Sequence, residues 1–478
     1  HKFDPISQRD YYALGGIFHS TASIQKVEWG VWSWPVVAEL PETDTQRTER
    51  ETRLAQQRQQ IEQLKAEREQ AKQKRAEGAT ALAAKDEAAP DQPTRERLEK
   101  EQKDFDARIR ELDTQIPHAE FFASTTPAAF AVHDDATPAD MHITIRGNAH
   151  ALGDLVPRGF VQIMSPQPAT IPANESGRRQ LAEWLVSPSN PLTARVTVNR
   201  IWQKLFGEGL VRSVDYFGVR GDLPSHPELL DYLATRFVAE GWSQKRLIRD
   251  LVLSRAYQLS SIQEPMAIAV DPDNRLLWRM NRRRLDAESL RDSLLAASGK
   301  LLTSAGGPGL PLEYPENTGG LSKGGVNPPN FRLAKFRPEQ EFVRTIYLPI
   351  IRSAPQPGPG ELRNVFDFTL PAEFAGQRAV TTVPTQALFL MNAQVLKQRA
   401  KELALQIIST NGDDARLNAL WLRVLNRPIT ETERADTIAF LQDLRTLEAG
   451  TDAAAIDLRI WSELCHALLA SNEFLVRM

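Results

Sequence analysis

The chain has 478 residues, of which 41% are hydrophobic and 25% charged, and its formal net charge is −3. Its length predicts about three parts rather than one compact domain. The near-neutral charge gives non-specific nucleic-acid binding no electrostatic support, and no apolar run approaches the ~18 residues of a membrane-spanning helix. We therefore expect no nucleic-acid partner and no transmembrane segment in this chain.

Residues 1–43 form the first part. Ser7 or Asp10 is suited to cap a short helix, which would carry Tyr11, Leu14 and Phe18. An aromatic run follows, Trp-Gly-Val-Trp-Ser-Trp at 29–34. We expect these tryptophans to pack against the protein, with sugar stacking as the alternative.

Residues 44–118 predict a long antiparallel coiled-coil hairpin. The composition turns to Gln, Glu, Arg, Lys and Ala, and apolar residues recur at coiled-coil spacings. Pro90 and Pro93 mark the turn between the two arms. The first arm carries Leu54, Ile61, Leu64 and Ala71, and the second carries Leu98, Phe105, Ile109, Leu112 and Ile116. The charged outer face is either simply solvated or a docking surface for a protein partner.

Residues 119–175 predict a small β-rich module. Short apolar runs at 121–122, 129–132, 141–146 and 159–163 are separated by Pro, Gly, Asp and Asn. The simplest arrangement inserts the hairpin between β elements, so that the residues flanking it meet in space.

Residues 176–478 predict a large helical domain with a few strands, so the whole chain is expected to be mainly α. A Gly/Pro-rich loop at 299–338 interrupts it, followed by a strand at 342–351. Ser225 to Glu228 has a capping-box pattern, with Pro227 in the first turn. Helices are predicted at 178–185, 193–206, 244–253, 284–298, 386–408, 415–425, 431–447 and 456–474.

Four blocks of this domain resemble a known family. They are RQLAEWLVSPSNPLTARVTVNRIWQKLFGEGLV at 179–211, DYFGVRGDLPSHPELLDYLA at 215–234, DPDNRLLWRMNRRRLDAESLRDSLL at 271–295 and RAVTTVPTQALFLMN at 378–392. They are similar to the planctomycete PSD-type domain of unknown function. The opening HKFDPISQRDYYAL resembles the last stretch of its usual neighbour, the planctomycete cytochrome-type domain of unknown function.

The resemblance implies more than this chain holds. In relatives, the stretch similar to residues 1–5 follows directly after a Cys-x-x-Cys-His motif that binds haem covalently. We therefore expect a haem c group upstream of His1 in the full-length protein and no cofactor within this chain. Relatives also look exported, which implies a periplasmic or secreted location. The family has no established reaction, so it supplies no catalytic residues.

A polar cluster after the Gly/Pro-rich loop is the main candidate site. Guanidinium groups beside a Gly-rich segment could hold a carboxylate or a sulfate through paired hydrogen bonds. Alternatively, nearby acidic residues satisfy these arginines internally. The candidate ligand-binding residues are Arg344, Arg352, Asp367, Arg378, Thr382, Gln386 and Asn392.

Other polar groups can be interpreted either as structural or as functional. Arg195, Asn199 and Trp202 share a helical face that either lines a cleft or joins helices through buried hydrogen bonds. The run at 282–284 could meet an anionic polymer, or it could cap carbonyls or remain solvated, and Asp271 to Asn274 favours a helix N-cap over a calcium loop. No metal site is expected.

The single cysteine, Cys465, has apolar neighbours, which favours a buried structural thiol over a nucleophile. The sequence has no HExxH, GxSxG or P-loop motif, so catalytic residues stay unknown. The leading hypothesis is an extracytoplasmic binding or scaffold module, for an anionic polysaccharide or a protein partner, that works with an upstream haem c domain. The alternatives are a redox enzyme or polysaccharide hydrolase, and a structural envelope protein.

Overall fold

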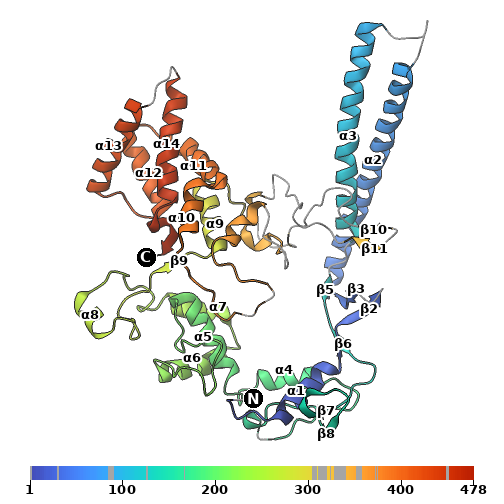
Figure 1. The fold of residues 1–478 in the computed structure, drawn as a ribbon, viewed down its shortest axis with the longest axis vertical. Coiled ribbons are helices and arrows are strands. Elements are labelled where there is room, and N and C mark those ends of the chain that lie inside the picture. The colour runs from blue at the N-terminus through green and yellow to red at the C-terminus, as the bar shows by residue number, and fades with distance from the viewer. Residues whose placement is uncertain are drawn as a thin grey trace. The chain divides into compact units, whose positions relative to one another are not determined.

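The computed structural model is mainly helical, as the sequence predicts, and forms two compact units (Figure 1). Unit 1 spans Pro5–Trp184, and unit 2 spans Leu185–Met478 together with Lys2–Asp4. The described residues are 3–28, 32–83, 91–124, 128–165, 167–303, 309, 320–322, 325–327, 341–350, 358–371, 373, 375–447 and 452–477.

Unit 1 begins with helix α1 (Gln8–His19). Ser7 is its N-cap, and the capping box with Asp10 confirms the predicted start. Tyr12 and Ile17 are buried, whereas Tyr11 is 69% exposed, because the helix packs its Tyr12 side against strand β7 (Met141–Thr144).

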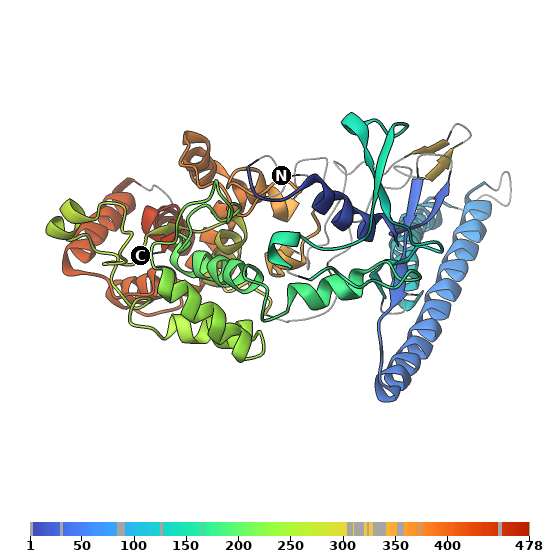
Figure 2. The same cartoon turned by 90° about the horizontal axis from the view of Figure 1, so that it is seen from below.

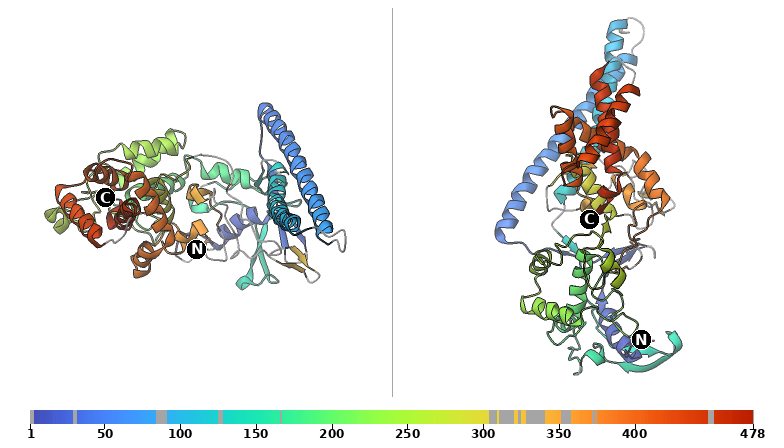
Figure 3. Two further views of the ribbon diagram at one scale, coloured as in Figure 1. Left: turned by 90° about the horizontal axis from the view of Figure 1, so that it is seen from above. Right: turned by 90° about the vertical axis from the view of Figure 1, so that its left-hand side faces the viewer.

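The hairpin is confirmed as two long helices, α2 (Asp44–Ala83) and α3 (Gln92–Ser124), shown in blue and cyan in Figure 3. Apolar residues of the predicted seam are buried between the arms: Ile61, Ala71, Leu112 and Ile116. Ion pairs also join the arms, such as Arg75–Asp106 at 2.6 Å. Pro90, which was predicted to mark the turn, lies outside the described residues.

The hairpin is inserted between paired strands, as predicted. Strand β4 (Val37–Glu39) precedes it and pairs antiparallel with β5 (Ala128–Phe130), which follows it. In the same unit β1 (Thr21–Ala22) pairs with β6 (His133–Asp134), and β2 (Ile24–Glu28) pairs with β3 (Trp32–Pro35). The side chains of the Trp run at 29–34 lie outside the described residues.

Two predicted β runs of this module are wrong. Residues 121–122 belong to α3, because a two-residue apolar run carries no alternation that separates strand from helix. The run at 159–163 leads instead into a 3₁₀ helix, η3 (Gln162–Met164), because the Gln162 N–H donates to the Asp10 carboxylate rather than to a strand. The run at 141–146 is confirmed in part. Met141–Thr144 form strand β7, which is followed by the 3₁₀ helix η2 (Ile145–Gly147) and pairs with strand β8 (Leu152–Val156).

The first half of unit 2 is a small helical cluster that follows α4 (Arg178–Leu185). Its helices are α5 (Thr193–Phe206), α6 (Pro227–Ala239), α7 (Gln244–Val252) and the short α8 (Pro265–Val270). Helices α5 and α6, green in Figure 2, pack side by side through residues that include Trp202, Phe206 and Phe237. Pro227 opens α6, but the predicted capping box is wrong, because the N-cap is His226 without a side-chain bond.

The second half of unit 2 is a larger helical cluster. It comprises α9 (Ala287–Ala297), α10 (Pro384–Asn392), α11 (Gln394–Ile407), α12 (Asp413–Leu425), α13 (Glu431–Leu447), α14 (Ala453–Leu469) and α15 (Asn472–Leu475). The predicted continuous helix at 386–408 is broken at Ala393, which has an extended backbone. Trp461 and Cys465 of α14 are fully buried in this core, and burial raises the pKa of the Cys465 thiol.

Short strands complete unit 2. Strand β9 (Arg283–Arg284) pairs antiparallel with β12 (Val476–Arg477), and β10 (Gly320–Ser322) pairs with β11 (Gly325–Asn327). Among the described residues, every helix is too short or too polar to cross a membrane.

The predicted strand at 342–351 is wrong over its described part. Val343 makes one isolated bridge to Leu302, and the 3₁₀ helix η6 (Thr345–Tyr347) follows. Side chains take the place of a neighbouring strand there, because the Thr345 N–H donates to Asp292 (2.8 Å) and its carbonyl accepts from Arg363 (2.8 Å). Farther on lies η7 (Gly358–Asn364).

Candidate functional site

Helix α9 lies at the centre of the candidate site. Asp286 is its N-cap and accepts a hydrogen bond from the Ser289 N–H at 2.8 Å. Leu290 and Leu294 face the core, so the opposite side of the helix is left open. Two cavities border the first turns of this helix, and Asp286 lines both.

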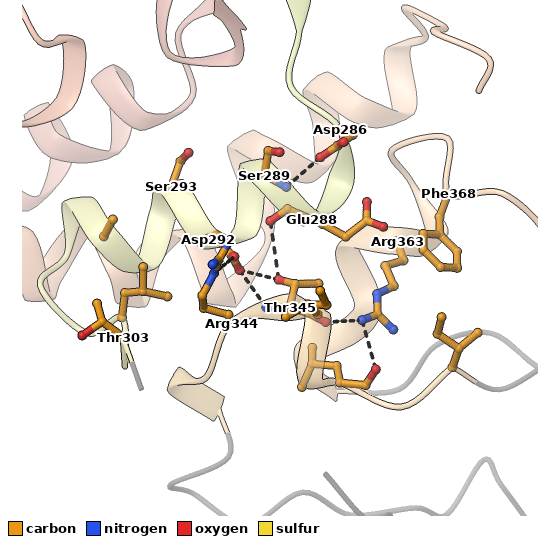
Figure 4. Close-up of a pocket in the computed structure, with 15 residues that line it drawn as sticks. Asp286, Glu288, Ser289, Asp292, Ser293, Thr303, Arg344, Thr345, Arg363 and Phe368 are labelled. Atoms are coloured by element: carbon orange, nitrogen blue, oxygen red, sulfur yellow. Dashed lines mark hydrogen bonds and ion pairs between the residues drawn. The ribbon is translucent and has the colours of Figure 1, made fainter. Parts of the chain in front are cut away.

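The first, which we call the carboxylate cavity, has a volume of about 740 Å³ (Figure 4). This is within the usual range for small-molecule sites. Its charged lining has three carboxylates and two guanidiniums, so it is not a basic pocket. The polar and aromatic lining residues are Asp286, Glu288, Ser289, Asp292, Ser293, Thr303, Arg344, Thr345, Arg363 and Phe368.

Asp292 organises the floor of the carboxylate cavity. It accepts hydrogen bonds from the Thr345 hydroxyl at 2.7 Å and from Arg344 Nε at 3.3 Å (Figure 4). Arg363 is 5% exposed and donates to the backbone carbonyls of Thr345 and Leu348. Burial lowers the pKa of Arg363. Its Nε has no acceptor among the described residues.

The second, which we call the basic cavity, has a volume of about 460 Å³. Its lining contains six basic and four acidic side chains, which leaves an excess of positive charge. The charged lining residues are Lys204, Arg212, Arg282, Arg283, Arg284 and Arg378, with Glu208, Asp273, Asp286 and Asp367.

The basic residues of this cavity differ in what they bind. Arg283 donates to the carbonyls of Lys204 and Leu205 at the end of α5, and burial lowers its pKa. This confirms the capping interpretation for that arginine. By contrast, the Lys204 and Arg282 side chains are exposed and make no hydrogen bond or ion pair with the described part of the chain.

Asp367 and Arg284 form a partly buried ion pair in the lining of the basic cavity. Their atoms approach to 2.5 Å, and Asp367 also accepts from the N–H and hydroxyl of Thr381. Burial by itself would raise the pKa of Asp367, but these hydrogen bonds hold it below its ordinary value. Gln386, also buried, donates to Thr381 and to the Val365 carbonyl, which fixes this turn.

A second ion pair separates the two cavities. Arg378, in the basic cavity, donates from both Nη atoms to Glu288, in the carboxylate cavity, at 2.6 and 2.8 Å. These hydrogen bonds raise the pKa of Arg378. Phe368 lies beside the pair, with the Arg378 guanidinium carbon 5.3 Å from its ring centre.

The structure therefore divides the residues that the sequence grouped together. Arg344 lines the carboxylate cavity, whereas Asp367 and Arg378 line the basic cavity. Thr382 and Asn392 are exposed and line neither, and the Asn392 amide donates to Leu388 of its own helix. Arg352 lies outside the described residues.

The face of α5 proves structural. Asn199 is fully buried and bonds both backbone groups of Val211, at 2.8 and 2.9 Å. Trp202 is buried against Phe206, and Arg195 pairs with Asp231 at 2.7 Å. Asn199 and Trp202 therefore join chain segments through buried contacts, whereas Arg195 makes its ion pair at the surface.

Two details of the polar motifs also differ from expectation. Asp271 caps no helix start, because its carboxylate accepts from the backbone of Arg275 and Leu276 in a turn. Lys204 and Arg212, which line the basic cavity, were missed as candidates. Lys204 belongs to α5 and Arg212 follows that helix. The sequence does not show that the 282–284 run packs beside α5, so it could not indicate that these residues share a cavity with the run. In the described residues, no three His, Cys, Asp or Glu side chains gather into a metal site.

Comparison with known protein families shows which part of the chain contains the two cavities. The PSD1 family model, described as a protein of unknown function (DUF1553), matches residues 177–441. The chain belongs to the PSD1 family. The matched range contains every residue that lines the two cavities. No curated protein and no solved structure matches the chain.

Proposed function

We propose that the PSD1 domain of this chain is a binding module for an anionic ligand, and that the anion is held in the basic cavity. The observation that carries this is the pair of exposed cations, Lys204 and Arg282, which line the cavity and account for its excess of positive charge. Cations without internal partners lose no existing bond when they bind an anion.

The arrangement of the other arginines supports the proposal. Arg283 is held by backbone carbonyls, so it keeps its charge beside the cavity without moving, and Arg284 is fixed there by its ion pair with Asp367. Arg212 is fixed in the same way, because it donates to the Asp273 carbonyl at 2.8 Å. Preorganised charge of this kind binds an anion at a lower entropic cost than mobile side chains do.

The test is a calorimetric titration of the full chain with sodium sulfate. The double substitution Lys204→Glu with Arg282→Glu is expected to weaken sulfate binding roughly tenfold or more, because it reverses two charges at the cavity. The matched control is Lys245→Glu with Arg249→Glu on α7, which makes the same charge change at exposed positions that line neither cavity. Equal loss of binding in both variants, or no sulfate binding by the parent chain, would contradict the proposal.

We extend the proposal to an extracytoplasmic module that works with an upstream haem c domain, on the strength of the family resemblance. A protein partner at the hairpin 44–118 is part of the same proposal. On the described side chains of the hairpin no large apolar residue is exposed, so such a partner would have to recognise charge. Expression of the full-length protein with haem maturation, followed by its absorption spectrum, tests the haem component.

A further inference from the structure

The two cavities are separated by a thin wall. Asp286 lines both, and the Arg378–Glu288 ion pair connects one lining to the other. Asp367 and Phe368, consecutive in the chain, lie in the basic and carboxylate cavities respectively. A ligand longer than a single small anion could therefore contact both cavities across the first turn of α9.

The open side of α9 has an unusual composition for an exposed helix face. Ser289, Asp292, Ser293 and Ala296 follow at helical spacing and all line the carboxylate cavity. Exposed helix faces usually carry long charged side chains, which would fill such a cavity. Short side chains instead allow a ligand to approach the helix backbone closely.

The chemistry of this lining suits hydroxyl groups. The Ser289 and Ser293 hydroxyls have no hydrogen-bond partner in the described part of the chain, and each can both donate and accept. Carboxylates at Asp286, Glu288 and Asp292 are acceptors. Arg363, almost completely buried in the wall, retains an Nε–H without an acceptor. Hydrogen-bond donors and acceptors at this density match a polyol, whereas three carboxylates would repel a phosphate backbone.

We infer that the carboxylate cavity and the basic cavity are two subsites of one site, and that its ligand is an acidic oligosaccharide. The sugar hydroxyls lie along the open face of α9, and a carboxylate or sulfate substituent lies in the basic cavity. This inference rests on the proposed anion binding and adds the class of the ligand.

The test separates the two subsites by substitution. Ser289→Leu with Ser293→Leu fills the open face of α9 and removes both hydroxyls, while leucine favours the helix. The matched control is Thr235→Leu with Thr432→Leu, which makes the same kind of change at exposed helical positions outside both cavities. The probes are sodium sulfate, tetragalacturonate, a sulfated galactan tetrasaccharide, uncharged cellotetraose and tetraglutamate.

We expect at least one acidic tetrasaccharide to bind the parent chain more tightly than sulfate and than cellotetraose. The α9 double variant should lose roughly tenfold or more of that affinity while its sulfate affinity is unchanged, because two hydrogen bonds and the cavity space are lost. Circular dichroism checks that the variant folds. If sulfate binds but the α9 variant binds the saccharide as the parent does, the two-subsite inference is wrong and the anion proposal survives. Tetraglutamate binding as tight as the acidic saccharides would reassign the site to an acidic peptide.

Discussion

Replacement of Asn199 by alanine is expected to destabilise unit 2. The side chain is fully buried, and its amide bonds both the N–H and the carbonyl of Val211, which is 3% exposed. Alanine would leave both backbone groups buried without a partner. At about 1–3 kcal/mol for each of the two groups, the loss is about 2–6 kcal/mol of the free energy of unfolding.

The assay is urea unfolding of the full chain, followed by tryptophan fluorescence, to which Trp202 on the same helix contributes. Asn392→Ala is the matched control, because that amide is exposed and bonds only within its own helix; it should change stability by less than about 0.5 kcal/mol. Sulfate binding should also weaken, because Val211 precedes Arg212 in the basic cavity. A stability of Asn199→Ala within about 1 kcal/mol of the parent would refute the reasoning.

Three further outcomes are expected. Glu288→Gln removes the charge that Arg378 now pairs with, so calorimetry should show tighter binding of sulfate. Unchanged or weaker binding would mean that Glu288 does not compete with the ligand for Arg378. Hydrogen bonds from Ser176 and Arg178 lower the pKa of Asp134 to about 2, so Asp134→Asn should reduce stability at neutral pH. Because the unfolded carboxyl titrates at ~3.9, the difference in stability between parent and variant should shrink as the pH falls from about 4 through 2. A pH-independent difference would exclude this linkage. Cys465 is buried with a raised pKa, so a disulfide reagent should modify it only after urea unfolding, and rapid modification of the native chain would show that the thiol is accessible.

Local patterns predicted the helices well because each signal is contained within a few residues. Helices α4, α5 and α13 have the predicted ends, and Ser7 caps α1 as expected. The hairpin followed from its heptad spacing, and its insertion between strands followed from the change of composition on both sides. Errors occurred where tertiary contacts replaced a local preference, as when Asp292 and Arg363 bound the backbone of Thr345 and prevented a strand.

The candidate site depended far more on contacts between distant residues. The acids that pair with Arg284 and Arg378 lie 83 and 90 residues away along the chain, so sequence proximity could not identify them. The sequence grouped Arg344 with Arg378, yet they line different cavities. It also treated the 282–284 run as one basic group, although Arg284 is partly buried in an ion pair while Arg282 remains exposed.

The sequence by itself determined the mainly helical class, the coiled-coil hairpin and the family of the C-terminal domain, because periodicity, capping and long similar blocks are properties of neighbouring residues. Only the tertiary structure decided which positive charges are neutralised and which remain open. That decision depends on packing, because a carboxylate within hydrogen-bond distance neutralises an arginine, whereas a backbone carbonyl fixes its position and leaves its charge.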